Sequence, residues 1–390
     1  MAKKRRYVDT GQGSFMGDFA YRSFIERHQS HFLVALEKLF DWDVYSEAFI
    51  ELYQGKGRRG RPPYNPMLIF KMLLISYLYD VSERDVERLV DENLIAKWFV
   101  GLAMDASPPD HSTLSAFKRR LIRGQGWETL ISVFDGLLQQ ARRHGLEMGS
   151  LQVMDSVHTQ DNVNHDKEKG RIDRGGKPRD PDSRVVNKGR RRHVAADGKE
   201  QETVVQYRGY KTHASVNVPS LIVTSIEPSM GNTADNKAFV ALRAHDRGLD
   251  LPVTIYGGDK AYDDTDIYAR LEQEGLMTGI TLRRFRTEKR DGNKQRWIEL
   301  AESEAYKMAV SQRYRVEQPF GLAKKWHGFE RCRYLGRERY AIQALFTFLI
   351  GNLKRYTKLL TGITFRAQAK GRRAEDIQPV YSQLPWVCCV

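Results

Sequence analysis

Apolar and polar residues follow two different patterns along the 390-residue chain, and the pattern changes near Ser150. Before this position, apolar residues recur at helical spacing. In the stretch VSERDVERLV, for example, Val86, Leu89 and Val90 share one helical face, and Ser82 precedes them as a helix cap. Beyond Ser150, short apolar runs end in Gly, Pro or Asp, which is typical of strands. We therefore expect a helical region followed by a mixed α/β region.

The helical part divides at a basic linker, GKGRRGRPPYNP, whose glycines and prolines rule out a continuous helix. Residues 1–60 form a leader and this linker, with an amphipathic helix over 24–40. Residues 61–148 form a helical domain, in which SPPDHSTLSAFKRRLI predicts a turn and a capped helix. Short helices, tight turns and a basic last helix favour a helix-turn-helix module, with Lys118, Arg119 and Arg120 contacting DNA. A plain helical bundle is the alternative.

The α/β part predicts a five-stranded mixed sheet with flanking helices. Strands are expected over 151–157, 207–218, 221–228, 253–257 and 278–284, and helices over 236–246 and 264–274. The second and third strands read as a hairpin joined by a Pro-Ser turn. This α/β domain would span 149–362, followed by a tail over 363–390.

Two apolar stretches, 67–79 and 341–353, predict buried helices rather than membrane spans. Both are shorter than the roughly 18 residues that a span needs, and Lys71 and Gln343 interrupt them. The three cysteines, Cys332, Cys388 and Cys389, have no metal-binding spacing and suit a reducing cytoplasm. No apolar segment of signal-peptide type follows the basic N-terminus, so we expect a cytoplasmic protein without a membrane partner.

The charge is concentrated in one segment. The chain has a net charge of +14, which favours a polyanionic partner such as nucleic acid. Residues 167–193, inside an insertion over 160–205, hold eleven Lys and Arg against four Asp and Glu and almost no large apolar residues. Such a segment cannot fold by itself. We interpret it as a loop that grips DNA phosphates, through Arg190, Arg191 and Arg192 among others. A solvated insertion is the alternative.

Two of the expected strands lead into a carboxylate. The run LQVM leads into Asp155, and VTIYGG leads into Asp259. If the two strands are neighbours, these acids could together hold a hard cation such as Mg²⁺, which prefers oxygen ligands. A helix cap or turn is the ordinary role of such an aspartate. That role is expected for Asp263, Asp264 and Asp266. His158, Asp161 and Asp166 could join the site, but positions that face solvent or DNA are expected for them.

A third carboxylate is expected from the segment SQRYRVEQPFGLAKKWHG. On a helical wheel, Arg313 and Lys324 fall within roughly 40° of Glu317. An acid that holds a metal beside two cations that hold phosphate would suit a phosphodiester substrate. An exposed ion pair is the alternative, and Pro319 should kink or break the helix. Trp326 could stack on an unpaired base, although core packing is the commoner role of a lone tryptophan.

From about residue 60 to 360, the sequence resembles the insertion-sequence transposases of the DDE superfamily, most closely the "insertion sequence five" group. The resemblance is carried by VMDS, GYKTHASV, GNTADNKAF, YGGDKAYDD and RYRVEQPFG. Arg313, Glu317 and Lys324 also fit the Tyr-(2)-Arg-(3)-Glu-(6)-Lys signature of related transposases. Val310 stands at the tyrosine position, so that residue's role does not carry over. Lys211, inside GYKTHASV, is expected to contact DNA.

The resemblance implies an RNase H-like, retroviral-integrase-like fold, in which the first and fourth strands place Asp155 and Asp259 side by side and a late helix brings Glu317. The glycines before Asp259 would let DNA and metal approach closely. The three acids would hold two Mg²⁺, for which Mn²⁺ can substitute. The protein would bind terminal inverted repeats, release a 3′-hydroxyl and join it to target DNA, as a homodimer or larger assembly on a bacterial or archaeal nucleoid.

Two rival functions remain open from the sequence. One is a DNA-binding repressor with an inactive catalytic domain, against which the carboxylates and the Arg-Glu-Lys spacing count. The other is a nuclease of the same fold that cuts DNA without joining it.

Overall fold

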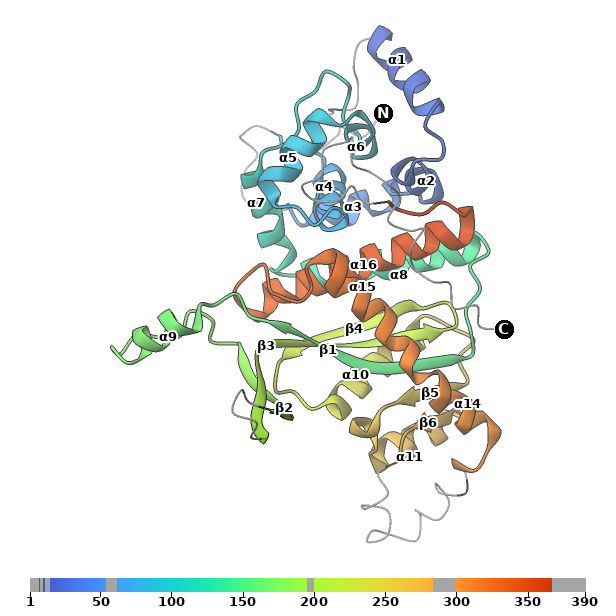
Figure 1. Ribbon diagram of the computed structural model, residues 1–390. Coiled ribbons are helices and arrows are strands. Elements are labelled where there is room, and N and C mark those ends of the chain that lie inside the picture. The colour runs from blue at the N-terminus through green and yellow to red at the C-terminus, as the bar shows by residue number, and fades with distance from the viewer. Residues whose placement is uncertain are drawn as a thin grey trace.

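The structure, a computed structural model, describes residues 7, 10, 15–53, 62–194, 200–282, 299 and 301–366. A helical region stands on one face of a mixed sheet, and further helices cover the other face (Figure 1). The helices of the N-terminal part are α1 (Phe15–Glu26), α2 (Phe32–Leu39), η1 (Asp43–Tyr45), α3 (Ser46–Glu51), α4 (Pro66–Leu78), α5 (Glu83–Glu92), α6 (Leu94–Phe99), α7 (His111–Leu121) and α8 (Gly126–Arg143).

Most helix signals in this region are confirmed, and one is corrected. Ser82 caps α5, and Asp110 caps α7 at the expected turn. The single helix expected over 24–40 is wrong, because α1 ends at Glu26 and α2 begins only at Phe32. His31 has an extended backbone, and its side chain accepts a hydrogen bond from Leu33 N, so it starts a new helix rather than continuing the first.

The strands are β1 (Leu151–Gln160), β2 (Arg184–Val194), β3 (Glu200–Val218), β4 (Ile222–Met230), β5 (Ile255–Gly258) and β6 (Met277–Ile280). They form a six-stranded sheet in the order β2-β3-β1-β5-β6, with β4 also paired to β3. β1 is antiparallel to β3 and parallel to β5, which is parallel to β6. All five expected strands are present, and the first and fourth of them, β1 and β5, are neighbours as predicted.

Successive side chains of β1 point to opposite faces of the sheet, and they therefore belong to two different hydrophobic cores. Val153 and Val157 belong to a core that includes α16 (Arg337–Thr361) and the N-terminal helices. Met154 belongs to a second core with α10 (Asp235–Gly248) and α11 (Thr265–Gln273) on the opposite face (Figure 1). The first core crosses the boundary expected at residue 149: the rings of Phe70 and Phe346, one from each side, lie 5.5 Å apart.

A helical rod crosses the sheet on the face of the first core. It consists of α14 (Glu304–Gln312), the 3₁₀ segment η3 (Arg313–Val316) and α15 (Glu317–His327). α14 packs on β5 and β6, η3 on β1, and α15 on α16. α14 lies close to the sheet because residue 279 is glycine: a Cβ there would meet Ala309 Cβ at 2.4 Å. The rod thus places η3 directly beside the strand that carries Asp155.

The basic insertion is folded, contrary to the expectation of a loop. α9 (His165–Ile172) projects as an arm, and β2 pairs with the first half of β3 (Figure 1). Buried acids anchor the arm: Asp161 accepts a hydrogen bond from Ser183 Oγ at 2.5 Å, and Asp180 accepts one from Tyr210 Oη at 2.5 Å. The expectation that Asp161 faces solvent or DNA is therefore wrong. Backbone pairing with β3 supplies stability that apolar residues could not, and the two hydrogen bonds offset the cost of burying the acids.

No helix in the described ranges is long and apolar enough to cross a membrane.

Candidate active site

Asp155 and Asp259 lie at the same level of two neighbouring parallel strands, Asp155 within β1 and Asp259 directly after β5. The register of β1 and β5 pairs Met154 with Gly258, and each aspartate is the next residue along the chain. Because each aspartate directly follows this last pair of the parallel register, the two residues lie side by side at one level of the sheet. The negative charge of Asp259 contributes to raising the pKa of Asp155, which places the two groups in electrostatic contact.

The Asp155 carboxyl group lies in a half-buried and electrostatically strained position. Burial, together with the charges of Asp259 and Asp235, raises its pKa to about 6. Two groups oppose the shift: the backbone N–H of Ser156 donates to Asp155 Oδ1 at 2.7 Å, and Arg313 brings a positive charge. A carboxyl group that is costly to ionise and faces another carboxylate is typical of functional sites.

The Asp259 carboxylate also shapes the backbone that follows it. Its Oδ1 accepts a hydrogen bond from Ala261 N at 2.8 Å and so caps η2 (Lys260–Tyr262). The glycine before it has a packing reason, because a Cβ on Gly258 would lie 3.1 Å from the Tyr262 ring; the expected approach of DNA and metal to this glycine stays a prediction. Asp264 caps α11, as expected.

Arg313 comes to the site from the helical rod. Its Nη1 lies 3.6 Å from Asp155 Oδ2, and both side chains are partly exposed. The residue occupies the 3₁₀ segment η3, so the regular helical wheel used to relate it to Glu317 does not apply. The helix expected here is interrupted, as predicted for a segment that contains Pro319: α14 ends at Gln312, and α15 begins at Glu317 after η3. Pro319 lies in the first turn of α15, where its missing N–H has no helical partner to lose.

Glu317 is exposed at the first position of α15, one short segment beyond Arg313. In the part of the chain that the structure describes, no three His, Cys, Asp or Glu side chains gather closely enough to hold a metal ion. The structure therefore brings together Asp155, Asp259 and Arg313, while Glu317 stands apart on the neighbouring helix end.

The residues expected further along α15 lie at the surface. Lys324 is exposed, and Trp326 is 38% exposed rather than part of the core. Lys325 Nζ lies 5.0 Å from the centre of the Trp326 ring. Both cations and the indole are thus available to a partner on the outer side of the rod.

Of the cations predicted to contact DNA from α7, some are exposed and others already contact groups of the protein. Arg119 is exposed, whereas Arg120 lies over the Tyr53 ring at 4.2 Å. Lys118 is paired with Glu83 and lies 4.1 Å from the centre of the Tyr334 ring. These contacts occupy its ammonium within the protein.

Lys211 is buried, and its Nζ donates to Thr233 O at 2.9 Å and to Asp235 Oδ1 at 3.1 Å. Its predicted DNA contact is therefore wrong, because the ammonium is enclosed by the protein. The strand β2 also contains Arg190, Arg191 and Arg192, whose side chains are outside the part of the chain that the structure describes.

Sequence reasoning gave no role to two residues beside the aspartates. Asp235 starts α10 and raises the pKa of Asp155 through its charge. Tyr262 is fully buried, and among the described residues its Oη has no hydrogen-bond partner. Both fall in the recognised motifs GNTADNKAF and YGGDKAYDD, which were the only signal available for them.

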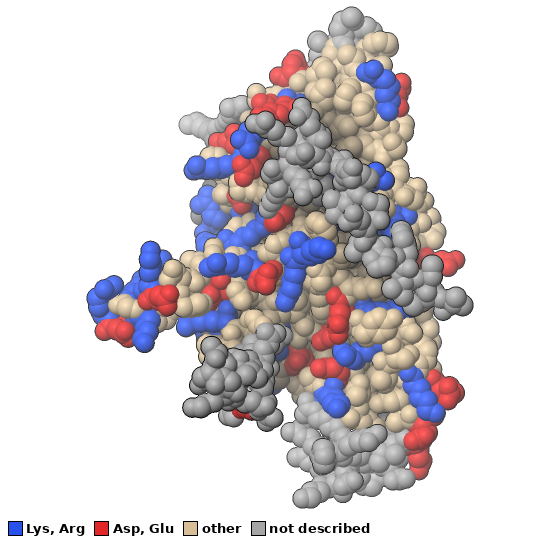
Figure 2. Space-filling view, in the orientation of Figure 1, with Lys and Arg blue, Asp and Glu red and all other residues tan. Residues whose placement is uncertain are grey.

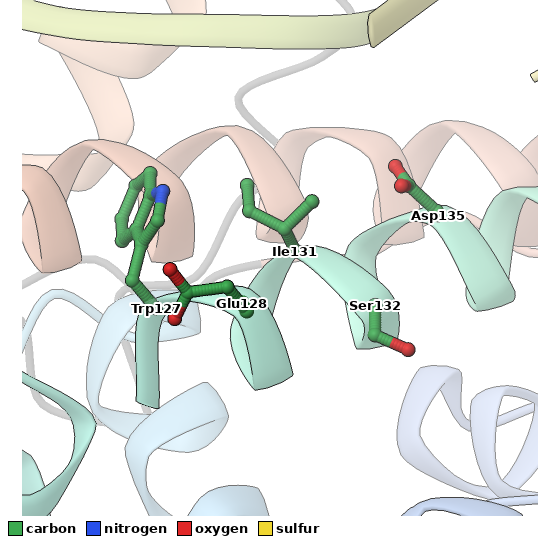
Figure 3. A pocket seen from close by; sticks show the side chains of 5 residues that line it. All are labelled: Trp127, Glu128, Ile131, Ser132 and Asp135. Atoms are coloured by element: carbon green, nitrogen blue, oxygen red, sulfur yellow. The ribbon is translucent and has the colours of Figure 1, made fainter. Parts of the chain in front are cut away.

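A surface pocket elsewhere carries no comparable chemistry. It is lined by five side chains of α8, Trp127, Glu128, Ile131, Ser132 and Asp135 (Figure 3). Asp135 is already engaged, with its Oδ1 2.8 Å from His245 Nε2. The pocket is an open surface along one helix, and none of the site residues above lines it.

Two sequence families match the chain. A family described as "Transposase domain (DUF772)" matches residues 21–120, and one described as "Transposase DDE domain" matches residues 173–353. Between them, they span most of the helical region and most of the sheet with its late helices.

Two solved structures are also similar to this one. One is a piggyBac transposase synaptic complex with hairpin DNA, at 11% identity over 85% of this chain and 76% of that chain, with a TM-score of 0.40. The other is the Mos1 strand transfer complex, at 10% identity over 80% of this chain and 83% of that chain, with a TM-score of 0.24. At such scores neither carries weight, and the RNase H-like assignment rests on the DDE family and the strand order. The finer likeness to the "insertion sequence five" group stays a prediction. With transposase families matching both its helical region and its sheet, this chain belongs to the DDE transposases of insertion sequences.

Proposed function

We propose that this transposase cuts the ends of a mobile element at terminal inverted repeats and joins the freed 3′-hydroxyl to target DNA, using Asp155, Asp259 and Glu317. One observation carries the proposal most. Asp155 within β1 and Asp259 directly after β5 lie at the same level of adjacent parallel strands, and the rod that contains Glu317 places Arg313 against Asp155. Carboxylates from separate elements beside a cation suit a phosphodiester substrate.

The residues present fit a divalent cation. The donors are carboxylate oxygens, which Mg²⁺ and Mn²⁺ prefer. Asp155 and Asp259 repel each other, and burial adds to the cost of ionising Asp155, so a cation between them would relieve both effects. Bound ions would supply activation of the attacking oxygen and stabilisation of the leaving oxygen. Asp155 and Asp259 would hold them from the sheet and Glu317 from α15.

The chain's own cations would place the DNA. Arg313 would share its charge between Asp155 and a phosphate beside the scissile bond, because it is partly exposed and near the aspartate. Lys324 would contact a phosphate farther along the outer side of α15. Such contacts hold the backbone in position and carry no sequence information. Trp326, on the same helix, could stack on an unpaired base at the element end.

A second DNA contact would come from the arm. Lys and Arg side chains gather on it (Figure 2). Among the described residues of the arm, the exposed cations are Lys167, Lys169, Arg174, Lys177 and Arg179. Asp161 and Asp180 are buried and hydrogen-bonded to Ser183 and Tyr210, so they add no negative charge to the surface of the arm. The surface charge of the arm is mainly positive, which favours phosphate binding. Arg119 on α7 would extend the contact from the helical region, where inverted-repeat recognition is expected.

Joining two element ends in one event requires two active sites, so we expect at least a homodimer on DNA, working on a bacterial or archaeal nucleoid.

A strand-transfer assay tests the proposed function directly. Labelled element ends would be incubated with the full chain, target plasmid and Mg²⁺, and the products separated by size. Joined product supports the proposal. Cut ends without joined product would indicate a nuclease, and binding without either product would indicate a repressor. Asp155→Asn is the matched control, because it removes a proposed metal ligand while keeping the side chain's shape.

A further inference from the structure

A group of buried polar residues lies on the opposite face of the sheet from Arg313. Asp235, at the start of α10, is at its centre. Lys211 Nζ lies 3.1 Å from Asp235 Oδ1, and His213 Nδ1 lies 3.2 Å from the same oxygen. Both of these basic side chains are buried, and His213 Nε2 is 3.0 Å from Ser229 Oγ. The carboxylate is therefore fixed by side chains that belong to β3.

This group reaches Asp155 through Ser156. The Ser156 side chain helps to lower the pKa of Asp235, and its backbone N–H donates to Asp155 Oδ1 at 2.7 Å. Ser156 is also paired with His213 in the register of β1 and β3. One residue therefore acts on Asp235 through its side chain while its amide holds the catalytic carboxylate on the other side. Alternation along the strand makes this two-sided arrangement possible.

The surroundings keep Asp235 ionised. Burial opposes its charge, but the neighbouring His213 and Ser156 side chains and the positive charge of Lys211 outweigh burial and hold its pKa well below the usual value. Tyr262 encloses the same region. After burial, the charges of Asp235, Asp155 and Asp259 all act to raise the pKa of its phenol. Asp235 thus belongs to the same electrostatic cluster as the two proposed metal ligands.

We propose that Asp235 is a positioning residue for the active site: through Ser156 it fixes the orientation of the Asp155 carboxylate, and Lys211 and His213 hold Asp235 in place. The inference rests on the proposed function, because it assumes that Asp155 binds a divalent cation. Outer residues that orient a metal ligand commonly contribute ten- to a hundredfold to metal affinity. A residue that served only the packing of α10 would contribute to stability and leave that affinity unchanged.

The chain offers a matched control in Asp246, near the other end of α10. Asp246 is also buried, and it accepts hydrogen bonds from Ser215 Oγ at 2.6 Å and Thr224 Oγ1 at 2.7 Å. It joins the same helix to the same sheet face by the same kind of bond, but none of these bonds involves Ser156. Asp246→Asn and Asp235→Asn should therefore perturb packing in similar ways.

The test measures Mn²⁺ binding to the full chain by calorimetry, with melting temperature and element-end DNA binding recorded alongside. Asp235→Asn and Ser156→Ala should weaken Mn²⁺ binding by roughly ten- to a hundredfold while DNA binding stays within about threefold. Asp246→Asn should lower the melting temperature and leave Mn²⁺ affinity within about twofold. Ser156→Ala keeps the test informative if Asp235→Asn does not fold, since it removes one hydroxyl only.

Wild-type Mn²⁺ affinity in both Asp235→Asn and Ser156→Ala would overturn the inference, as would an equal loss in Asp246→Asn. Asp155→Asn separates this failure from failure of the proposed function. If Asp155→Asn abolishes Mn²⁺ binding and Asp235→Asn does not affect it, only the positioning role is wrong. If Asp155→Asn also binds Mn²⁺ normally, the proposed metal site itself is wrong.

Discussion

Arg313 Nη1 lies 3.6 Å from Asp155 Oδ2, although the two residues are 158 positions apart in sequence and come from the rod and the central strand. The contact sets a cation next to a carboxyl group whose pKa is raised to about 6 by burial first and by neighbouring acids. Arg313 opposes that rise. The position of the rod over the sheet therefore determines both the charge and the surroundings of the proposed catalytic aspartate.

Removing this cation should slow the chemistry more than it weakens binding. Arg313→Ala should lower end cleavage by about ten- to a hundredfold, which corresponds to roughly 1.5–3 kcal/mol for a charge-assisted contact made in the transition state. Arg313→Lys keeps the charge and should retain more activity. Single-turnover cleavage at saturating protein measures this. Unchanged cleavage in Arg313→Ala would mean that Arg313 serves only the ion pair.

Lys324 should affect rate without affecting sequence preference. Lys324→Ala should reduce cleavage and joining by about ten- to a hundredfold if its phosphate contact forms in the transition state, while the preferred terminal base pairs stay the same. Lys325→Ala is the matched control, because Lys325 lies on the same helix but over the Trp326 ring. Cleavage of intact and pre-nicked ends, and of ends with altered terminal base pairs, would be compared. A changed base preference with an unchanged rate would show that Lys324 reads bases.

The predicted strands and aspartates were accessible from sequence because their signals are local. Short apolar runs mark β1 and β5, and Asp155 and Asp259 follow directly in the same stretches. Their neighbourhood in space followed from the family resemblance rather than from periodicity. The split between α1 and α2 was missed although the residues from Glu26 to His31 are all polar, because His31, which caps α2, is not one of the usual helix-capping residues.

The errors concern pairings between distant residues. Lys211 looked like a surface cation, but its partners Thr233 and Asp235 lie on a different element, so its burial could not be read from local composition. The arm looked unable to fold for the same reason. β2 is stabilised by β3, and Asp180 is buried against Tyr210, a residue beyond the end of the basic segment. Charge composition predicts what a segment attracts but not what it pairs with.

The arm should contribute a salt-dependent, sequence-independent part of DNA binding. Replacing Lys167, Lys169 and Arg174 by Ala should weaken binding to specific and unrelated DNA alike. It should also flatten the log–log salt dependence by up to about one unit per lost phosphate contact. Arg190, Arg191 and Arg192 should behave in the same way if they share this surface.

A triple control variant tests whether this effect is one of position or of net charge. Arg247, Arg270 and Lys358 are exposed on α10, α11 and α16, away from the arm. Their replacement by Ala removes the same charge and should leave the salt slope near that of the wild type. Equal slopes for both triple variants would assign the effect to net charge and not to the arm.

His327 should make stability sensitive to acid. It is buried on α15, and its Nδ1–H donates to Tyr77 O on α4 at 2.9 Å. Burial first, and then the charge of Lys354, lower its pKa from 6.5 to about 4. Between these two values the unfolded chain binds a proton that the folded chain does not, so stability falls as pH decreases through this window.

The expected loss from this one group between pH 7 and pH 5 is about 2 kcal/mol. His327→Gln should be less stable than the wild type at pH 7 but should lose about that much less on acidification. Urea unfolding at pH 7, 6 and 5 measures both quantities. The same pH dependence in variant and wild type would mean that folding does not lower the pKa of His327.

The most direct test of the account is cleavage of element ends in Mg²⁺ by Asp155→Asn, Asp259→Asn and Glu317→Gln, with end binding measured in parallel. If the three acids share bound ions, each variant should lose cleavage below detection while binding the ends within about threefold of the wild type. Glu317 is the decisive member, since the structure shows it exposed at the start of α15 and apart from the two aspartates. Cleavage by Glu317→Gln at the wild-type rate would contradict the account and assign the third ligand to another acid of the rod.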